Sequence, residues 1–345
     1  MNDSAAASIS ESGPKLESGI AISVVIPTYR RFELLRRCLT AVCAQDFAPE
    51  RFDVIVADDD ASPGRSALMR EWIAQEFVCL TGKPRVRYVL VTDTQGPAGA
   101  RNRGWREAHG EVIAFTDDDT IPDPSWLSRG WAAMAQGFHA VAGTIRMPLR
   151  ETPTDYERNA AGLSTAEFAT ANCFVRRAAL EAVGGFDERF TAAWREDSDL
   201  QFALLERGFS CGSAPDAIVV HPIRPAAWGV SIAQQRKIVF DALLFKKHRQ
   251  RYREHIRSSP PWRYYVIVGL ALMMAAAAAA SLFWIALASG LAWAALTVHF
   301  CLQRLAGNSH AWPHVLEMAV TSVVLPPLGV YWRLRGAVRY RVLFL

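Results

Sequence analysis

The feature that most constrains the fold is a pair of apolar runs, each of which is followed by three consecutive aspartates. Residues 112–115 lead into Asp117, Asp118 and Asp119, and residues 52–57 lead into a second triplet at 58–60. Both runs are typical of strands inside a parallel sheet, which is covered on both faces. A single triplet is explained as a turn or helix cap, but two at strand ends predict an acidic cleft. Adjacent carboxylates repel one another, so this cleft favours a divalent cation.

The order of the remaining segments predicts an α/β domain over residues 20–225. Apolar or β-branched runs at 20–26, 52–57, 86–91 and 112–115 alternate with segments of helical periodicity. Such an order gives a largely parallel sheet flanked by helices. Residues 151–164 are polar, and we expect them to form a loop over the cleft.

Three further groups of residues have chemistry that fits a cleft. The glycine-rich turn at 96–106 opens a helix that carries Arg101, which favours a phosphate, although an ordinary strand-to-helix connection would look the same. The helix expected from residue 194 begins with Glu196, Asp197 and Asp199, which fit either helix capping or a substrate-facing base. His221 ends a short strand, where a structural role and a metal-binding role are equally plausible.

The composition places the chain at a membrane. Of its residues, 51% are hydrophobic, and the excess lies in the last third, so residues 263–345 are predicted to be transmembrane or membrane-associated helices. Residues 264–300 contain no charge and are long enough for nearly two crossings, with a turn at Ser289-Gly290. The apolar piece 314–332 contains Pro326-Pro327 and predicts a broken span, a re-entrant element or an interfacial helix.

The distribution of basic residues suggests a topology. Two spans and a re-entrant third piece place all the basic residues that flank the apolar segments in the cytoplasm, as the positive-inside rule requires. Three full spans would place four arginines outside. Residues 226–262 combine apolar and basic side chains and predict an amphipathic helix on an anionic membrane surface. We therefore expect a multi-pass protein of the inner membrane with its catalytic domain in the cytoplasm.

The net charge argues against a nucleic-acid-binding protein, and the cysteine spacing argues against a metal site built from cysteines. The net charge of +4 is too small to indicate a nucleic-acid partner. The six cysteines show no metal-binding spacing and fit a reduced compartment. Residues 1–19 lack the basic and apolar regions of a signal peptide and predict a disordered tail.

Six motifs occur in the order found in family 2 glycosyltransferases of the GT-A type, and the chain resembles that family over residues 20–225. They are VVIPTYRR (24–31), VADDDASP (56–63), GPAGARNRGW (96–105), FTDDDTIP (115–122), GGFDE (184–188) and WREDSDL (194–200). Each motif is weak alone, but six in order are specific. The resemblance implies a GT-A, Rossmann-like, mostly parallel sheet flanked by helices, followed by a C-terminal α-helical membrane region.

The resemblance also implies how a nucleotide-sugar donor is held. The ends of the first two strands would bind the base and ribose through Pro27, Thr28, Tyr29 and Asp58. Arg101 matches the arginine of the A-R-N segment, which contacts the nucleotide or its phosphates. Each of these roles is an expectation carried over from the family.

The metal and the catalytic base follow from the same resemblance. Asp117 would lie near the ribose, and Asp119 would bind Mn²⁺ or Mg²⁺, with His221 as a further metal or diphosphate contact. Asp118 is expected to point back into the fold. Asp197 would act as the base for an acceptor hydroxyl, and a single displacement then inverts the anomeric carbon.

The acceptor is expected to be lipid-linked or part of an envelope glycan. Residues 234–238 (QQRKI) depart from the Q-x-x-R-W motif of processive synthases, so we expect one sugar to be added per visit. Two alternatives stay open: transfer to a polyprenyl phosphate, which needs no base, and a membrane scaffold that binds nucleotide or glycan without turnover.

Overall fold

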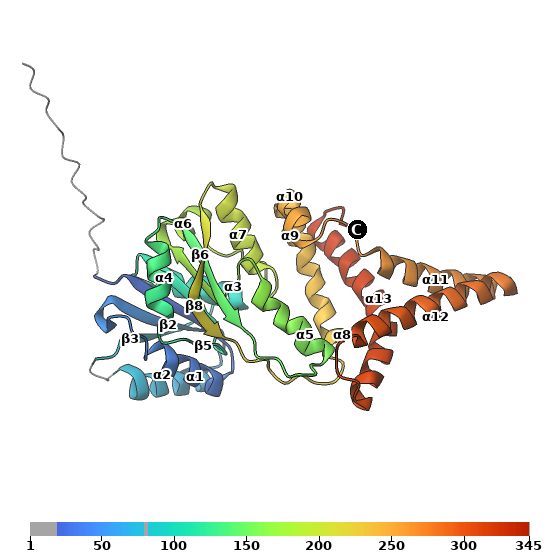
Figure 1. The fold of residues 1–345 in the computed structure, drawn as a ribbon. Coiled ribbons are helices and arrows are strands. Elements are labelled where there is room, and N and C mark those ends of the chain that lie inside the picture. Colours follow the sequence, from blue (N-terminus) through green and yellow to red (C-terminus); the bar gives the residue numbers. More distant parts are fainter. Residues whose placement is uncertain (1–18, 79–81, 345) are drawn as a thin grey trace, which may run out of the picture.

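The computed structural model describes residues 19–78 and 82–344, and it consists of an α/β domain followed by a helical region (Figure 1). The predicted disordered tail lies outside the described residues except for Gly19. The α/β domain contains one sheet, and the helical region includes a hairpin of two helices that projects away from the rest of the molecule.

The sheet has eight strands in the described part of the chain, in the order β3-β2-β1-β4-β7-β6-β8-β5. The strands are β1 (Ile22–Thr28), β2 (Phe52–Asp58), β3 (Arg85–Leu90), β4 (Val112–Thr116), β5 (Ile121–Pro122), β6 (Ala140–Arg146), β7 (Asn172–Arg176) and β8 (Cys211–Val220). Strands β1 to β4 are mutually parallel where they pair, as are β6 and β8, whereas β7 and β5 run antiparallel to their neighbours. The predicted mostly parallel α/β sheet is therefore confirmed.

The position of β1 brings the two aspartate triplets together. β1 lies between β2 and β4 and is parallel to both, with Thr28 opposite Asp58. The carboxyl ends of parallel neighbours share one edge of the sheet, so both triplets lie at that edge.

Helices cover both faces of the sheet, and two apolar clusters form the core. The helices are α1 (Phe32–Val42), α2 (Pro63–Ile73), α3 (Pro97–Arg106), α4 (Trp126–Met134), α5 (Asp155–Ala161), α6 (Arg177–Val183) and α7 (Glu196–Glu206). Ile22, Val24 and Ile26 of β1 join the cluster that contains α1, α2 and α4 side chains, whereas Val25 joins the cluster with α3, α6 and α7. This alternation of side chains is the two-residue period of a strand that is buried on both faces.

One prediction for this domain is wrong, because residues 151–164 do not form a loop. They contain α5, which begins with a capping box in which Thr154 accepts from the backbone of Glu157 and Glu157 accepts from the backbone of Thr154. Two otherwise unpaired backbone donors are thereby satisfied, and this is enough to start a helix in a polar segment. The T-x-x-E spacing was present in the sequence.

Residues 226–262 also differ from the single amphipathic helix that was predicted. They form α8 (Val230–Gln234), a 3₁₀ turn, α9 (Val239–Lys247), α10 (Arg249–Arg251) and a π turn. Residues 239–245 are all buried, and Phe240 and residues 242–245 form a cluster with Phe190, Phe202 and Phe344. These apolar side chains are therefore enclosed by the protein, because the segment packs between the α/β domain and the last helix, with the one acid, Asp241, paired with Arg195.

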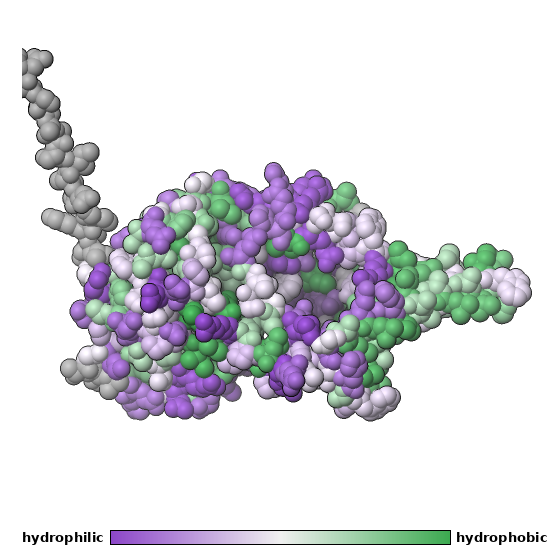
Figure 2. All heavy atoms as spheres, viewed as in Figure 1, coloured by the Kyte–Doolittle hydropathy of each residue, from purple (hydrophilic) through white to green (hydrophobic). Residues whose placement is uncertain are grey.

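Three helices of the described residues are long and apolar enough to cross a membrane: α11 (Trp262–Ala279), α12 (Phe283–Leu305) and α13 (Trp312–Tyr340). The predicted hairpin is present in α11 and α12, but the chain turns at residues 280–282 and not at Ser289-Gly290. Gly290 lies inside α12, where a Cβ atom would come within 3.0 Å of the Met274 sulfur, so the glycine allows close packing of the two helices. Figure 2 shows the projecting hairpin as an apolar surface.

The last helix, α13, is continuous over 29 residues and includes Pro326 and Pro327, so of the three predicted alternatives the broken span is not the one seen. Its two ends are both held against other parts of the described chain. Next to its N-terminal end, the Ser309 N–H donates to the Pro153 carbonyl at 2.8 Å, and at its C-terminal end, Lys246 Nζ donates to the Tyr340 carbonyl at 2.9 Å. Figure 1 shows α13 running across the base of the α11–α12 hairpin.

Candidate active site

The aspartate triplet at 117–119 supplies two of three possible metal ligands. Asp117, Asp119 and His221 each offer one ligand atom, and these atoms lie within 4.8 Å of one another. His221 Nε2 is 3.4 Å from Asp119 Oδ1. The strand order explains this, because β8 ends beside β5, which directly follows the triplet.

The residues present fit a divalent cation. Asp119 is only 5% exposed, and among the described residues its Oδ2 accepts no hydrogen bond. The Arg224 guanidinium, 3.1 Å away, partly compensates its charge. Two carboxylates and an imidazole, with one buried oxygen left without a donor, suit Mn²⁺ or Mg²⁺. Arg224 was not among the predicted site residues. The only signal for it in the sequence was its position three residues after His221.

The middle aspartate of this triplet points into the fold, as predicted. Asp118 accepts hydrogen bonds from Thr28 Oγ1 at 2.8 Å and from Arg31 Nη1 at 2.9 Å. Burial raises the pKa of the Asp118 carboxyl to about 6, although Arg31 opposes the shift. Asp118 therefore ties the end of β4 to the end of β1, and the Thr28 hydroxyl is already engaged by it.

The triplet at 58–60 organises the neighbouring strand ends. Asp58 is buried and accepts from the Tyr88 hydroxyl at 2.9 Å, and burial raises its pKa. Asp59 accepts from the Gly96 N–H at 2.6 Å and so holds the glycine-rich turn before α3. Asp58 thus lies at the predicted nucleotide edge with one hydroxyl donor already in place.

The remaining predicted nucleotide residues differ in exposure. Pro27 is buried in the sheet opposite Ala57, whereas the Tyr29 side chain is 48% exposed. Arg30 lies over the Tyr29 ring, 4.9 Å from its centroid, and donates to Asp60 at 2.9 Å. Of these residues, Tyr29 is therefore the one with an open aromatic surface.

Arg101 connects the triplet to the acids of α7. It is 2% exposed and donates to Asp117 Oδ1 at 2.8 Å and to Glu196 Oε1 at 3.0 Å. Burial raises the pKa of Glu196 to about 7 against the effect of Arg101. Burial would also raise the pKa of Asp117, but Arg101 and His221 lower it overall. Sequence reasoning placed Arg101 on a phosphate and did not find this buried bridge.

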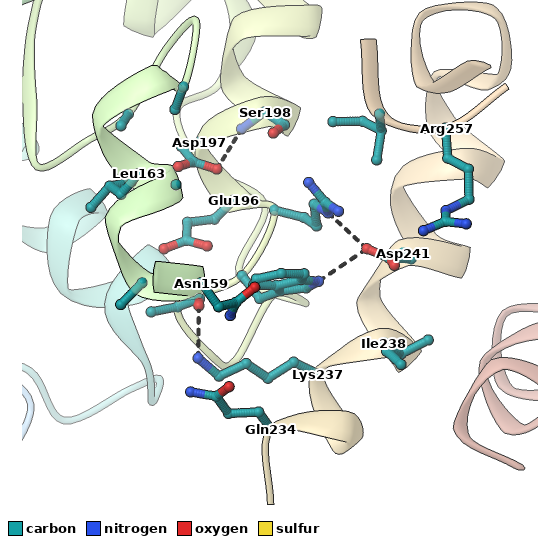
Figure 3. A pocket seen from close by; sticks show the side chains of 18 of the residues that line it. Asn159, Leu163, Glu196, Asp197, Ser198, Gln234, Lys237, Ile238, Asp241 and Arg257 are labelled. Atoms are coloured by element: carbon teal, nitrogen blue, oxygen red, sulfur yellow. Dashed lines mark hydrogen bonds and ion pairs between the residues drawn. The ribbon is translucent and has the colours of Figure 1, made fainter. Parts of the chain in front are cut away.

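Asp197 lies beside this bridge and lines a cavity of about 1230 Å³ that Asp117 and His221 also line. Its Oδ1 accepts from the Ser198 N–H at 2.7 Å. Burial raises its pKa, against the opposing Ser198 hydrogen bond. Figure 3 shows Asp197 and Glu196 on one wall of the cavity, with Lys237 and Asp241 on the other side.

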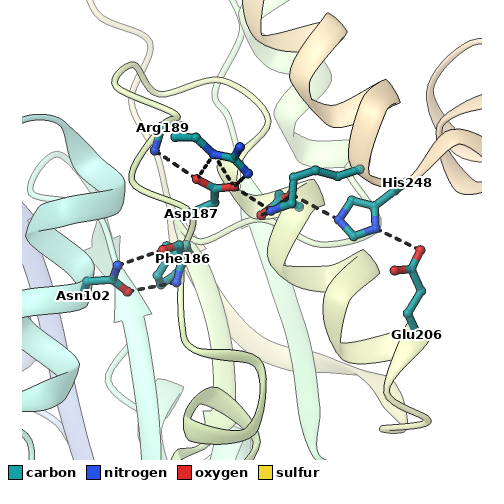
Figure 4. Close-up of polar contacts among 8 residues, drawn as sticks. Asn102, Phe186, Asp187, Arg189, Glu206 and His248 are labelled. Carbon is teal, nitrogen blue, oxygen red and sulfur yellow. Dashed lines mark hydrogen bonds and ion pairs between the residues drawn. The ribbon is translucent and has the colours of Figure 1, made fainter. Parts of the chain in front are cut away.

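The GGFDE motif positions this wall through Asn102 (Figure 4). The Asn102 side chain donates to the Phe186 carbonyl at 2.8 Å and accepts from the Phe186 N–H at 2.9 Å. Gly185 has φ +77°, and a Cβ atom there would lie 2.5 Å from Asn102 Oδ1. Only glycine fits this position, so the motif locks the loop before α7 onto α3.

A second network joins α7 to the helical region. His248 Nε2 lies 3.1 Å from Asp199, and its Nδ1 lies 2.9 Å from Glu206, while Lys247 donates to Asp199 at 2.7 Å (Figure 4). Burial alone would lower the pKa of His248, but its bonds to Asp199 and Glu206 raise it overall. Asp199, which was grouped with the possible bases, therefore has a structural partner set.

Comparison with known proteins decides the family. The family model described as Glycosyl transferase family group 2 matches residues 112–307, and the model described as Glycosyl transferase family 2 matches residues 23–193. The chain belongs to glycosyltransferase family 2. The predicted resemblance is thereby confirmed, and the Asp117, Asp119 and Asp197 positions fall in the motifs that carried it.

Two similar proteins illustrate this membership. The chain is 28% identical over 214 residues to glycosyltransferase AglE of Haloferax volcanii, covering 59% of this chain and 67% of that protein. It is 31% identical over 99 residues to the GalNAc(5)-diNAcBac-PP-undecaprenol beta-1,3-glucosyltransferase of Campylobacter jejuni, covering 28% and 29%. For two further curated relatives the matched region spans about half of their length.

A solved structure shares the fold of this glycosyltransferase. The mannosyltransferase PcManGT of Pyrobaculum calidifontis, in complex with GDP-Man and Mn²⁺, superposes with a TM-score of 0.56 at 20% identity and covers 94% of this chain and 89% of its own. The coverage extends beyond the α/β domain into the helical region. This likeness establishes the GT-A-type fold.

Proposed function

We propose that this family 2 glycosyltransferase moves one sugar from a nucleotide-sugar donor to an acceptor hydroxyl, with inversion, at the cytoplasmic face of a membrane. The observation that carries the proposal is that Asp197 lines the same cavity as Asp117 and His221. A base and a metal-binding edge on one cavity are what a single displacement requires.

The donor would lie along the carboxyl edge of the sheet. Pro27, Thr28, Tyr29 and Asp58 are proposed to hold the nucleotide, with Tyr29 offering its exposed ring to the base. Asp117, Asp119 and His221 would hold Mn²⁺ or Mg²⁺, which when bound supplies Lewis-acid stabilisation of the diphosphate. The PcManGT complex contains a nucleotide sugar and Mn²⁺, which supports this choice of donor and ion.

The acceptor would be activated by Asp197. Its carboxylate takes the hydroxyl proton while the acceptor oxygen bonds to the anomeric carbon from the face opposite the diphosphate. The bond from the anomeric carbon to the diphosphate oxygen breaks, and the nucleoside diphosphate leaves with the electron pair. The raised pKa of Asp197 makes it a stronger base than an ordinary aspartate.

Arg101 and Glu196 would orient these groups without taking part in proton transfer. The Arg101 guanidinium holds Asp117 on one side and Glu196 on the other, within a buried bridge. Because Glu196 directly precedes Asp197, this bridge sets the distance between the base and the donor edge, by which we mean the carboxyl edge of the sheet where the donor is proposed to bind. A rigid bridge of this kind keeps reacting groups in position.

The membrane arrangement we propose has two crossings. α11 and α12 have 18 and 23 residues, or about 27 and 34 Å, which matches a hydrocarbon core of about 30 Å. The contacts at both ends of α13 support a position along the membrane surface on the side of the α/β domain. Its exposed residues are mostly apolar and include Trp312, Leu316, Val320, Val323, Tyr331, Leu334 and Val338, with Arg335 and Arg339 near its C-terminal end.

A panel of nucleotide sugars tests the proposed function. The full chain in membranes is incubated with each donor, Mn²⁺ or Mg²⁺ and a membrane lipid extract, alongside Asp197→Asn. We expect one donor to give a glycosylated lipid product that depends on the metal and on Asp197. Binding of a nucleotide sugar without any turnover, across all donors and extracts, would instead support the scaffold alternative. Full transfer by Asp197→Asn would favour an acceptor phosphate that needs no base.

A further inference from the structure

The cavity extends well beyond the donor edge, into the helical region. It is lined at one end by Arg101, Asp117 and Asp197 and at the other by residues 260–264, Phe300 and Gly329 of the membrane helices. Its volume of about 1230 Å³ exceeds the usual range of about 300–1,000 Å³ for a small-molecule pocket. The cavity therefore has room for a donor and for a second ligand that reaches it from the membrane side.

The two ends of the cavity differ in how their cations are paired. At the donor end, Arg101 bonds to Asp117 and Glu196, and Arg195 is paired with Asp241 of the helical side at 2.7 Å. These guanidinium groups are neutralised by the chain itself. The carboxylates at this end make it a poor place for a second anion.

Lys237, on the opposite wall, has no bonded carboxylate partner among the described residues, and its Nζ lies 5.9 Å from the centroid of the Trp194 ring. Its side chain is partly buried, and in the described residues its Nζ donates only to the Ala193 carbonyl at 3.3 Å. Glu196 acts on it electrostatically, but that carboxylate is already bonded to Arg101. Burial lowers the pKa of Lys237, and the like charge of Arg224 adds to this effect. A half-buried ammonium without a bonded carboxylate is costly, and an anionic ligand would remove that cost.

Two arginines continue this positive wall toward the membrane. Arg257 lines the cavity just before α11, and its guanidinium forms no ion pair within the part of the chain that the structure describes. Arg263, in the first turn of α11, lies 5.6 Å from the Phe300 ring and donates to Gln303, an uncharged partner. Figure 3 shows Lys237 and Arg257 on the helical side, across from Asp197. The unneutralised cations thus lie between the reacting end and the membrane helices.

We propose that Lys237, Arg257 and Arg263 form a subsite for the phosphate or diphosphate of a lipid-carried acceptor. This inference rests on the proposed sugar transfer and names its acceptor class. The lipid would enter beside Trp262 and Phe300, its phosphate groups would stay on the three cations, and its sugar hydroxyl would reach Asp197. The reacting group is then a hydroxyl, because the acids at the donor end disfavour a phosphate there.

Binding of a short prenyl probe tests the subsite without requiring turnover. The full chain in nanodiscs of phosphatidylcholine is titrated with farnesyl diphosphate and with farnesol, and Lys237→Gln is compared with Arg253→Gln. Arg253 is exposed and lies outside the cavity lining, so it matches the charge change in the same helical segment. We expect the wild type and Arg253→Gln to bind farnesyl diphosphate more tightly than farnesol. In Lys237→Gln the ratio of the two affinities should fall about tenfold, which corresponds to the loss of one charge-assisted hydrogen bond.

Two further measurements separate this subsite from other anion sites. The proposal would be overturned if wild type and Lys237→Gln preferred the diphosphate over farnesol to the same degree. It would also be overturned if Lys237→Gln lost nucleotide affinity by the same factor as diphosphate affinity, since the lysine would then be part of the donor site. Vesicles with and without phosphatidylglycerol test for a general headgroup contact. If Lys237→Gln weakens flotation on the anionic vesicles but leaves diphosphate binding unchanged, the site is a membrane anchor and the proposal fails. These binding measurements do not require sugar transfer. A failure of the proposed reaction would therefore be detected separately, in the assay with the panel of nucleotide sugars.

Discussion

Replacing Asp197 with asparagine should separate catalysis from binding. The introduced amide would keep an oxygen that accepts from the Ser198 N–H, so the start of α7 is preserved. The proposed metal ligands Asp117, Asp119 and His221 belong to other elements and are untouched. The substitution therefore removes the proton acceptor and little else.

The size of the effect follows from the role of the carboxylate. Loss of a positioned general base lowers the rate by about 100- to 10,000-fold, which corresponds to about 2.7–5.5 kcal/mol in the activation barrier. We expect kcat to fall by this factor while the Kd of the nucleotide sugar changes less than about twofold, since asparagine cannot accept the proton but does not touch the donor. Asp216→Asn is the matched control, because this aspartate is exposed on β8 and forms no ion pair in the described chain.

The pH dependence sharpens the same test. Burial raises the pKa of Asp197 above its ordinary value, and the base acts only when ionised. In the wild type, kcat/KM should fall as the pH drops through this raised pKa, and in Asp197→Asn that acidic limb should disappear. The assays are steady-state transfer across the pH range and calorimetric titration of the donor with Mn²⁺. A variant that retains transfer within tenfold of wild type, or keeps the acidic limb, would refute the assignment.

Three more outcomes are expected. Asp119→Ala should weaken Mn²⁺ binding and abolish the metal dependence of donor binding, as measured by titration with and without a chelator; unchanged Mn²⁺ affinity would contradict the metal site. His248 has a folded pKa raised above its unfolded value of about 6.5, so its stabilisation should be complete below pH 6.5 and decline as the pH rises through the folded pKa; thermal unfolding of His248→Gln should lack that decline. The topology is tested with single cysteines in a cysteine-free background and a maleimide that does not cross the membrane. This reagent should label Ser281→Cys in intact cells but Arg339→Cys only after permeabilisation. Labelling of both variants in intact cells would favour three spans.

Much of the donor edge was predictable, because its geometry follows from strand direction. Once residues 52–57 and 112–115 are parallel strands on either side of β1, their aspartates must meet at one edge. The roles within each triplet are less accessible to sequence reasoning. That Asp118 turns inward depends on donors from Thr28 and Arg31, which lie about 90 residues earlier in the chain.

The errors came from segments whose structure is decided by packing. Ser289-Gly290 resembles a turn, but in α12 the glycine faces Met274 of α11, and close helix packing outweighs its low helix propensity. Pro326-Pro327 resembles a break, yet α13 runs through it, and the helix packs against α8, α9, α11 and α12. Residues 239–245 resemble one face of a surface helix, but they are buried on all sides.

Lys237 shows most directly what local spacing cannot supply. In the sequence it is only a departure from a processive-synthase motif, and nothing near it in the chain indicates a ligand. Its position in the cavity depends on α9, which the bond between Asp241 and Arg195 and the His248 network hold against the α/β domain. The packing that buries residues 239–245 therefore also brings this cation opposite Asp197. A substitution such as His248→Gln that loosens this packing should move the Lys237 wall and weaken acceptor binding before donor binding, because the donor edge is built from strand ends and from Arg101 of α3, outside the helical region.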